Sequence, residues 1–247
     1  MGGAERDANA TDLRFRNARV ARSGDDFPER LEQILPNHTA AAWRTLRDVL
    51  PDCFYLIGGT AVVVRLRHRE SRDLDFFAHE TDIDLDALAK ELEELPESVV
   101  THRSPATLKG LIGETKVELF VDADEERPQR ALEPPELVAG LHLASLKDLA
   151  AMKLKVVGDR GEMRDYFDLK LIEEQGEITV EDGLAYFFER YGADPRGPAL
   201  GHIVRALGYL DDVEEDPSLP ITKRELASWW RKRQAALIRH LDRRSRP

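Results

Sequence analysis

Residues 55–77, YLIGGTAVVVRLRHRESRDLDFF, contain the most informative pattern in the chain. An apolar run ends at two glycines, as expected for a buried strand that stops at a turn. The β-branched run that follows is compatible with a strand or with a buried helix. A strand directly after Gly58 and Gly59 would need a hairpin, so we favour a helix. The alternating acidic and apolar residues at 73–77 then predict a second strand.

The start of this predicted helix has the features of a phosphate-binding site. Gly58 and Gly59 let a phosphate approach the backbone, and a helix N-terminus offers unpaired N–H groups and the positive end of a dipole. Thr60 adds a hydroxyl at the same place. The chain has no G-x-x-x-x-G-K pattern here, so this is not a P-loop.

Carboxylates follow on the predicted strands. Asp73 and Asp75 are alternate residues, which point to one face of a strand, where their charges repel unless a cation holds them. Glu118, in KVELFVDA, interrupts the apolar run of another strand. Hard oxygen ligands favour Mg²⁺ or Mn²⁺, and three carboxylates beside a phosphate site suit two-metal phosphoryl transfer. The alternative is that Asp73 caps the strand and the other two lie on a solvated sheet face.

The remaining patterns predict an α/β (α+β) fold with a small mixed sheet, flanking helices and a helical C-terminal domain. We expect a helix from Thr39, as N-cap, to Leu50, an amphipathic helix over 82–95, and a three-stranded meander over 98–122. After Pro134 and Pro135 every pattern is helical. The expected division is a disordered segment 1–26, an α/β domain 27–130 and a helical domain 131–247 with a basic tail.

Composition limits the function classes. The 247 residues carry 36 Lys and Arg against 47 Asp and Glu, a formal charge of −11. This composition excludes collagen-like and disulfide-scaffold chains, and no apolar run is long enough to span a bilayer. The N-terminus has no apolar h-region of a secretory signal, and the single Cys53 fits a reducing compartment. We therefore expect a cytoplasmic protein without a membrane partner.

The order G-G-T, twelve residues, D-x-D and a later third acid resembles the DNA polymerase β-like nucleotidyltransferase superfamily. A second block, LKDLAAMKLKVVGDRGEMRDYFDL at 146–169, narrows the resemblance. Together the two blocks resemble the AbiEii/AbiGii toxin family of nucleotidyltransferases, which are toxins of bacterial toxin–antitoxin and abortive-infection systems. The resemblance covers about residues 40–175, and the rest of the helical part carries no motif that we can match.

The resemblance implies roles for the second block. Lys153 matches the family's lysine and is implied to contact the nucleotide triphosphate. Asp165 matches an aspartate near the active site, and spacing leaves open whether it is a general base or a partner of Lys153. Asp168 would be a structural acid that caps the helix or pairs with an arginine. On spacing alone, Lys153 is a surface lysine and Asp165 part of a surface ion pair. The predicted core stripe of this helix consists of Leu146, Leu149, Met152 and Val156.

The resemblance also implies the reaction. An NTP would bind at Gly58, Gly59 and Thr60 with Mg²⁺, and its NMP would pass to an RNA acceptor, the tRNA 3′ end, which blocks aminoacylation. A cognate antitoxin would neutralise the enzyme. Arg69 and Ser71 would bind phosphate or orient the carboxylates, unless they are plain loop residues.

The charge distribution leaves alternatives open. Residues 223–247 carry nine Lys or Arg and two acids, so this segment is the natural RNA contact, with Trp229 or Trp230 as a base-stacking partner or a core residue. It is equally well read as a solvated last helix. The acidic remainder supports transfer to a small-molecule or protein hydroxyl instead. A third reading is a catalytically inactive nucleotide-binding module.

Overall fold

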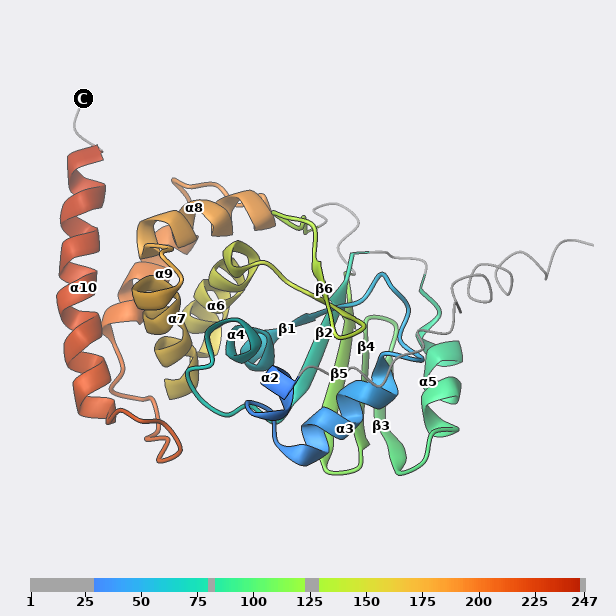
Figure 1. Cartoon of the computed structure of the whole chain (residues 1–247). Coiled ribbons are helices and arrows are strands. Elements are labelled where there is room, and N and C mark those ends of the chain that lie inside the picture. Colours follow the sequence, from blue (N-terminus) through green and yellow to red (C-terminus); the bar gives the residue numbers. More distant parts are fainter. Residues whose placement is uncertain (1–28, 80–82, 123–128, 245–247) are drawn as a thin grey trace, which may run out of the picture.

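The computed structural model describes residues 29–79, 83–122 and 129–244. The segment 1–26, which the sequence predicts to be disordered, lies outside the described residues. A mixed sheet forms one side of the molecule, and the helices of the C-terminal part gather on the other (Figure 1). No helix in the described part of the chain combines the length and apolar character that a membrane crossing requires.

The sheet has seven strands in the order β3-β4-β5-β2-β1-β7-β6. β2 is parallel to β5 and β1 is parallel to β7, whereas the other neighbours are antiparallel. The predicted mixed sheet and the meander are therefore confirmed. The strand bounds are β1 Tyr55–Ile57, β2 Leu74–Ala78, β3 Ser98–Ser104, β4 Thr107–Ile112, β5 Thr115–Val121, β6 Glu136–Val138 and β7 Leu141–Leu143.

The predicted helix after the glycines is present as α4, and three other helices start at residues whose side chains cap them. Asp84 accepts hydrogen bonds from the first-turn N–H groups of α5, and Ser145 and Thr179 cap α6 and α8. The helix bounds are α2 Glu29–Glu32, α3 Asn37–Leu46, α4 Gly58–Leu66, α5 Leu85–Glu93, α6 Leu146–Arg160, α7 Met163–Gln175, α8 Val180–Tyr191, α9 Pro198–Gly208 and α10 Lys223–Arg244.

Two details of the prediction are wrong. Thr39 does not cap α3, which begins two residues earlier after Pro36; the buried Thr39 hydroxyl donates instead to the Arg72 carbonyl oxygen at 3.1 Å. The region after residue 136 is not all helical, because β6 and β7 form a hairpin there and β7 joins the sheet beside β1. These strands have three residues each, too few to show alternation, and the turn between them has positive φ at Ala139 and Gly140.

The expected domain boundary between residues 130 and 131 stays a prediction. A buried ion pair of Arg190 and Asp148 in the helical part also contacts β1 of the sheet. The Arg190 side chain of α8 is fully buried and donates to Asp148 of α6 and, at 3.0 Å, to the Tyr55 hydroxyl of β1. Asp148 also accepts from the Ser145 hydroxyl at 2.6 Å. A buried charge is tolerated only with such partners, so this pair fixes how the helices sit on the sheet.

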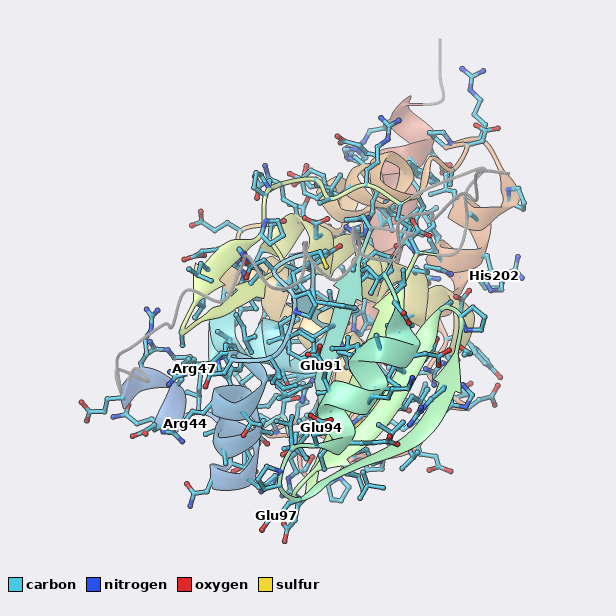
Figure 2. The ribbon with its side chains drawn as sticks, turned by 90° about the vertical axis from the view of Figure 1, so that its right-hand side faces the viewer. Arg44, Arg47, Glu91, Glu94, Glu97 and His202 are labelled. Atoms are coloured by element: carbon cyan, nitrogen blue, oxygen red, sulfur yellow. The ribbon has the colours of Figure 1, made fainter. Side chains whose placement is uncertain are left out.

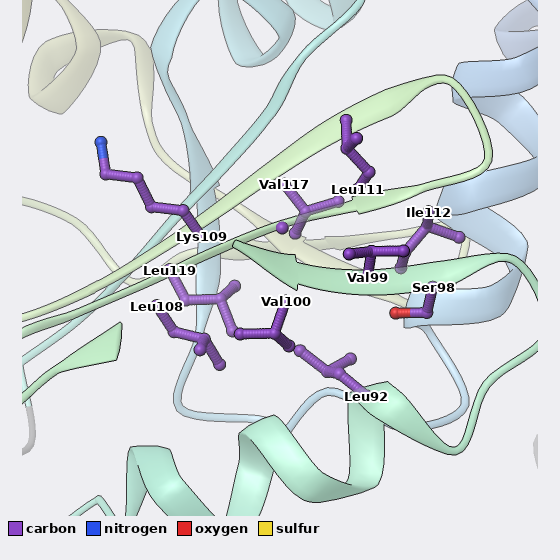
Figure 3. Close-up of a pocket in the computed structure, with 11 residues that line it drawn as sticks. Leu92, Ser98, Val99, Val100, Leu108, Lys109, Leu111, Ile112, Val117 and Leu119 are labelled. Carbon is purple, nitrogen blue, oxygen red and sulfur yellow. The ribbon is translucent and has the colours of Figure 1, made fainter. Parts of the chain in front are cut away.

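Helix α5 covers one face of the sheet at the β3–β4–β5 end. Leu92 of α5 packs there against apolar side chains of the meander around a cavity of about 10 Å³, room for about one water molecule (Figure 3). Lys109 points away from Leu108 and Leu119 in this view. Alternation along β4 and β5 therefore places Lys109 and Glu118 on the other face of the sheet.

Candidate active site

Gly58 and Gly59 begin α4 directly after β1. Gly58 has φ +71°, and a side-chain methyl there would lie 2.5 Å from Oδ2 of Asp75. A methyl at Gly59 would lie 2.5 Å from a guanidinium nitrogen of Arg69. Glycine is thus needed at both positions so that the carboxylate and the guanidinium can approach the first turn of α4, where N–H groups are unpaired.

Gly58→Ala is expected to lower transfer activity at least tenfold, because the new methyl must displace the Asp75 carboxylate. Gly192→Ala is the matched control, since Gly192 also has positive φ, at +56°, but nothing within 4 Å of a methyl. Both substitutions carry a backbone strain of about 1–2 kcal/mol. Steady-state transfer rates and thermal melts separate strain from displacement. Equal activity of the two variants would contradict this role of Gly58.

Thr60 and Ser71 hold the loop that carries Asp73. The Thr60 side chain is buried, its hydroxyl lies 2.8 Å from the Ser71 hydroxyl, and it donates to the Asp73 carbonyl oxygen. The observed partners are therefore protein atoms that position Asp73. The predicted contacts of Thr60 and Ser71 with a nucleotide stay predictions.

The carboxylates lie next to one another across the sheet. Asp73 directly precedes β2, and Asp75 of β2 is in register with Glu118 of β5. Burial, followed by the negative charges of Glu118 and Asp73, raises the pKa of Asp75 to about 6, although Lys153 and Arg164 act in the opposite direction. The cluster therefore carries negative charge that nearby cations do not fully balance.

Lys109 is a neighbour of this cluster that the sequence analysis missed. It pairs with Glu118 across β4 and β5, and its Nζ lies 2.9 Å from Oε2 of Glu118. In the sequence, Lys109 stands out as a charged residue in a largely apolar strand. Its partner Glu118 follows only from the register between β4 and β5. The Glu118 carboxylate therefore points toward Lys109.

The donor set fits a divalent cation in its chemistry, since Asp73, Asp75 and Glu118 offer hard carboxylate oxygens and the pKa of Asp75 is raised. The three are not gathered into a ready-made site: within the described ranges, no group of three Asp, Glu, His or Cys side chains is arranged to hold a metal ion. A cation bound by all three would compete with Lys109 for the Glu118 carboxylate.

Lys153 is buried, so the alternative from spacing alone, that it is a surface lysine, is wrong. Its Nζ lies 2.7 Å from Oδ1 of Asp165 and 2.7 Å from Oδ2 of Asp168. Helix α6 packs against α4, α7, α8 and α9, so that more than one side of it is buried. The predicted stripe is correct only in part for this reason. The fully buried apolar residues are Leu149, Ala150, Ala151, Leu154 and Val157.

Asp165 and Asp168 have different surroundings on α7. Asp165 accepts from the Glu162 N–H at 3.0 Å and so caps its own helix. Asp168 accepts from Nε and Nη2 of Arg69 at 2.7 and 2.9 Å, and lies 2.7 Å from Nε2 of His68. Burial alone would raise the pKa of Asp168, but these groups and Lys153 hold it well below its usual range.

The arginine partner expected for Asp168 is therefore Arg69, and the second partner, His68, was missed. The sequence around His68 has no spacing typical of metal ligands. His68 meets Asp168 because α4 packs against α7. Because Arg69 is held by Asp168, its predicted contact with phosphate stays a prediction. The whole group links the loop before Asp73 to Lys153.

The structure thus brings the glycine turn of α4 beside carboxylates of the mixed sheet, as the resemblance to nucleotidyltransferases implies. The sequence matches the family "Nucleotidyl transferase AbiEii toxin, Type IV TA system" over residues 41–246. The chain therefore belongs to the AbiEii family of type IV toxin–antitoxin systems, which confirms the resemblance, and the protein is a nucleotidyltransferase. Membership implies an NTP substrate and an antitoxin partner.

The chain is also similar to individual proteins. An uncharacterized protein of Aquifex aeolicus (strain VF5) is 30% identical over 166 residues, which cover 66% of this chain and 76% of the relative. A putative nucleotidyltransferase from H. pylori shares the fold with a TM-score of 0.53 at 19% identity, covering 85% of this chain and 97% of that one. ANT(2″)-Ia in complex with adenylyl-2″-tobramycin aligns with a TM-score of 0.44 at 21% identity, over 62% of this chain and 95% of that one.

The C-terminal helix is only partly free to bind a partner. Trp230 is buried and donates to the Tyr166 carbonyl oxygen at 3.1 Å, so one of the two tryptophans is a core residue as expected. Arg233 pairs with Glu173 at 2.6 Å and with Glu181. Arg231 and Lys232 are exposed. The basic segment therefore combines a packing side and an exposed side.

Proposed function

We propose that this nucleotidyltransferase moves an NMP from an NTP to an RNA acceptor, the tRNA 3′ end, in a reaction that depends on Mg²⁺ or Mn²⁺ and blocks translation. The observation that carries the proposal is the position of Asp75, which lies against Gly58 and between Asp73 and Glu118. A phosphate bound at the start of α4 would therefore lie beside these carboxylates. The acceptor and the metal also rest on the family resemblance.

The proposed roles follow from this arrangement. Asp73, Asp75 and Glu118 would hold the cation, which supplies charge stabilisation for the attacking and leaving oxygens. The first turn of α4 at Gly58 and Gly59 would bind the triphosphate. Lys153 would add a positive charge, held in place by Asp165 and Asp168. The acceptor hydroxyl would give its proton to solvent water and form a bond to the α-phosphorus. The bond from the α-phosphorus to the oxygen that bridges to the β-phosphate would break, and that oxygen would leave with pyrophosphate.

The acceptor is tested by incubating the full chain with total tRNA and each labelled NTP in turn, with Mg²⁺ and with EDTA, on a denaturing gel. We expect one NTP to label tRNA with Mg²⁺ and none with EDTA. Labelling that survives EDTA would contradict the metal requirement. If no RNA is labelled while pyrophosphate is released with a small-molecule or protein acceptor, the alternative acceptor class, which the formal charge of −11 favours, is correct.

A further inference from the structure

A cavity with charged and aliphatic side chains in its lining lies away from Asp73, Asp75 and Glu118. It has a volume of about 250 Å³ and is bordered by α2, the second half of α4, the β6–β7 hairpin and the start of α6. Figure 1 shows α2 beside α4 at this place. Arg30, Arg65, Arg67 and Glu136 line it together with aliphatic side chains such as Val64 and Leu146. We call this cavity the arginine pocket.

The arginine pocket has more positive than negative charge. Arg65 is fixed, because its Nε donates to the Ala144 carbonyl oxygen at 2.7 Å and its Nη1 lies 3.1 Å from Glu136. Arg30 and Arg67 are exposed, and neither side chain has a hydrogen bond or ion pair to another residue in the described part of the chain. Two of the three guanidinium groups are thus available to an anion.

Further arginines lie near the pocket. Figure 2 shows Arg44 of α3 and Arg47, which directly follows α3, close to α2. Both have acidic neighbours, because Arg44 pairs with Glu32 and Arg47 lies 3.8 Å from Asp48. The excess of positive charge at this place therefore comes from the three arginines of the pocket, which face the single carboxylate of Glu136.

The backbone at Arg67 is a second, independent observation. Arg67 ends α4 in the left-handed conformation, with φ 53° and ψ 40°. This position favours glycine, and another residue there carries strain of about 1–2 kcal/mol. An arginine placed in such a conformation at the mouth of a pocket is the kind of strained residue that marks a binding site.

The pocket and the phosphate-binding turn are the two ends of one helix. Nine residues of α4 separate them, a length of about 13 Å. Stacked nucleotides of one strand rise about 3.4 Å each, so this length corresponds to about four nucleotides. Arg65 holds the Ala144 carbonyl oxygen, and the Ala144 N–H donates to the Leu56 carbonyl oxygen at 3.0 Å. The two ends are therefore rigidly connected.

We propose that the arginine pocket binds a backbone phosphate of the polynucleotide acceptor, about four nucleotides from the hydroxyl that reacts. The inference rests on the proposed RNA acceptor. Arg30 and Arg67 would contact the phosphate, and the aliphatic lining would pack against its sugar. The volume of about 250 Å³ admits roughly one nucleotide unit and is at the small end of ligand pockets.

The test uses two full-length double variants that remove equal charge. The first is Arg30→Gln with Arg67→Gly, and the control is Arg196→Gln with Arg205→Gln, two exposed arginines outside the pocket. Binding of fluorescein-labelled total tRNA is measured across salt concentrations, and binding of a fluorescent ATP analogue is measured in parallel. We expect tRNA affinity to fall at least tenfold in the first variant only, with a salt slope shallower by about 1.

Affinity for the ATP analogue is expected to stay within twofold in both variants. Because Arg67→Gly relieves the strained backbone, that single variant is expected to melt no lower than wild type, and it is used alone if the double variant fails to fold. If wild type binds tRNA and the pocket variants bind it equally well, the pocket proposal is overturned while the proposed function stands.

Two other results would also overturn the pocket proposal. If wild type binds no tRNA at low salt, the pocket proposal falls together with the proposed RNA acceptor. If the pocket variants lose affinity for the ATP analogue but keep it for tRNA, the pocket takes a free nucleotide.

Discussion

Asp75→Asn is expected to reduce nucleotide transfer at least about a thousandfold, because loss of a metal ligand removes several kcal/mol of stabilisation from the transition state. The shape of the side chain is kept, so the fold should not change. Asp211→Asn is the control, since Asp211 is an exposed acid in the loop before α10. Transfer rates of the three proteins at saturating NTP measure the effect. Activity within tenfold of wild type would remove Asp75 from the proposed metal site.

The same substitution is expected to raise the stability of the metal-free protein at neutral pH. Burial and the charges of Glu118 and Asp73 raise the pKa of Asp75 from 3.8 to about 6, so the folded state binds the proton more tightly than the unfolded state. The stabilisation by the protonated carboxyl is full below pH 3.8 and is lost as the pH rises through about 6.

Above that range the ionised carboxylate lowers the free energy of unfolding by up to about 3 kcal/mol, at 1.36 kcal/mol per pKa unit. Melting temperatures of wild type and Asp75→Asn, taken in EDTA from pH 4 to pH 8, should therefore agree near pH 4, separate as the pH rises toward about 6, and differ by a constant amount above it, with the variant higher. A variant that melts lower than wild type at pH 8 would mean that the carboxylate is already balanced by protein groups.

Local patterns predicted the part of the fold that carries the site. The glycine pair after an apolar run, and the alternation along β2, β4 and β5, depend only on near neighbours in the chain, so β1, α4, β2 and the meander were recognised. The hairpin of β6 and β7 was missed because three-residue strands have no measurable period. β7 pairs with the edge of β1, and β6 pairs with β7, so these strands depend on the rest of the sheet.

The partners of the site residues were the main omission. Lys109 meets Glu118 through strand register, and His68 meets Asp168 across 100 residues of chain. Contacts of this kind depend on how elements pack, which spacing along one element does not contain. The error at Lys153 has the same origin: a helical stripe assumes one buried side, whereas α6 is covered on several sides.

Lys153→Met is expected to lower both stability and activity, in contrast to Lys147→Met. Burial alone would lower the pKa of Lys153, but Asp168 and Asp165 raise it, so the buried amine is charged. Its removal leaves two carboxylates without their shared cation, and breaking a buried pair costs about 3–5 kcal/mol. For a chain of this size the melting temperature should fall by about 6–20 °C at 2–4 °C per kcal/mol. Lys147 lies at the surface, where it pairs with Glu133 and its Nζ lies 5.7 Å from the centre of the Tyr186 ring, so its loss should change both properties far less.

The double variant Lys153→Met with Asp165→Asn separates the two effects. Asp168 keeps Arg69 and His68 as partners, so Asp165 is the carboxylate that Lys153→Met leaves without a cationic partner. Neutralising it should restore part of the lost melting temperature. Transfer activity should stay at least a hundredfold below wild type, because the positive charge proposed to face the triphosphate is still missing. If activity returns together with stability, Lys153 holds α6 to α7 and has no part in nucleotide transfer. If the single variant melts like wild type, the buried ion pair does not support the fold in the way its geometry indicates.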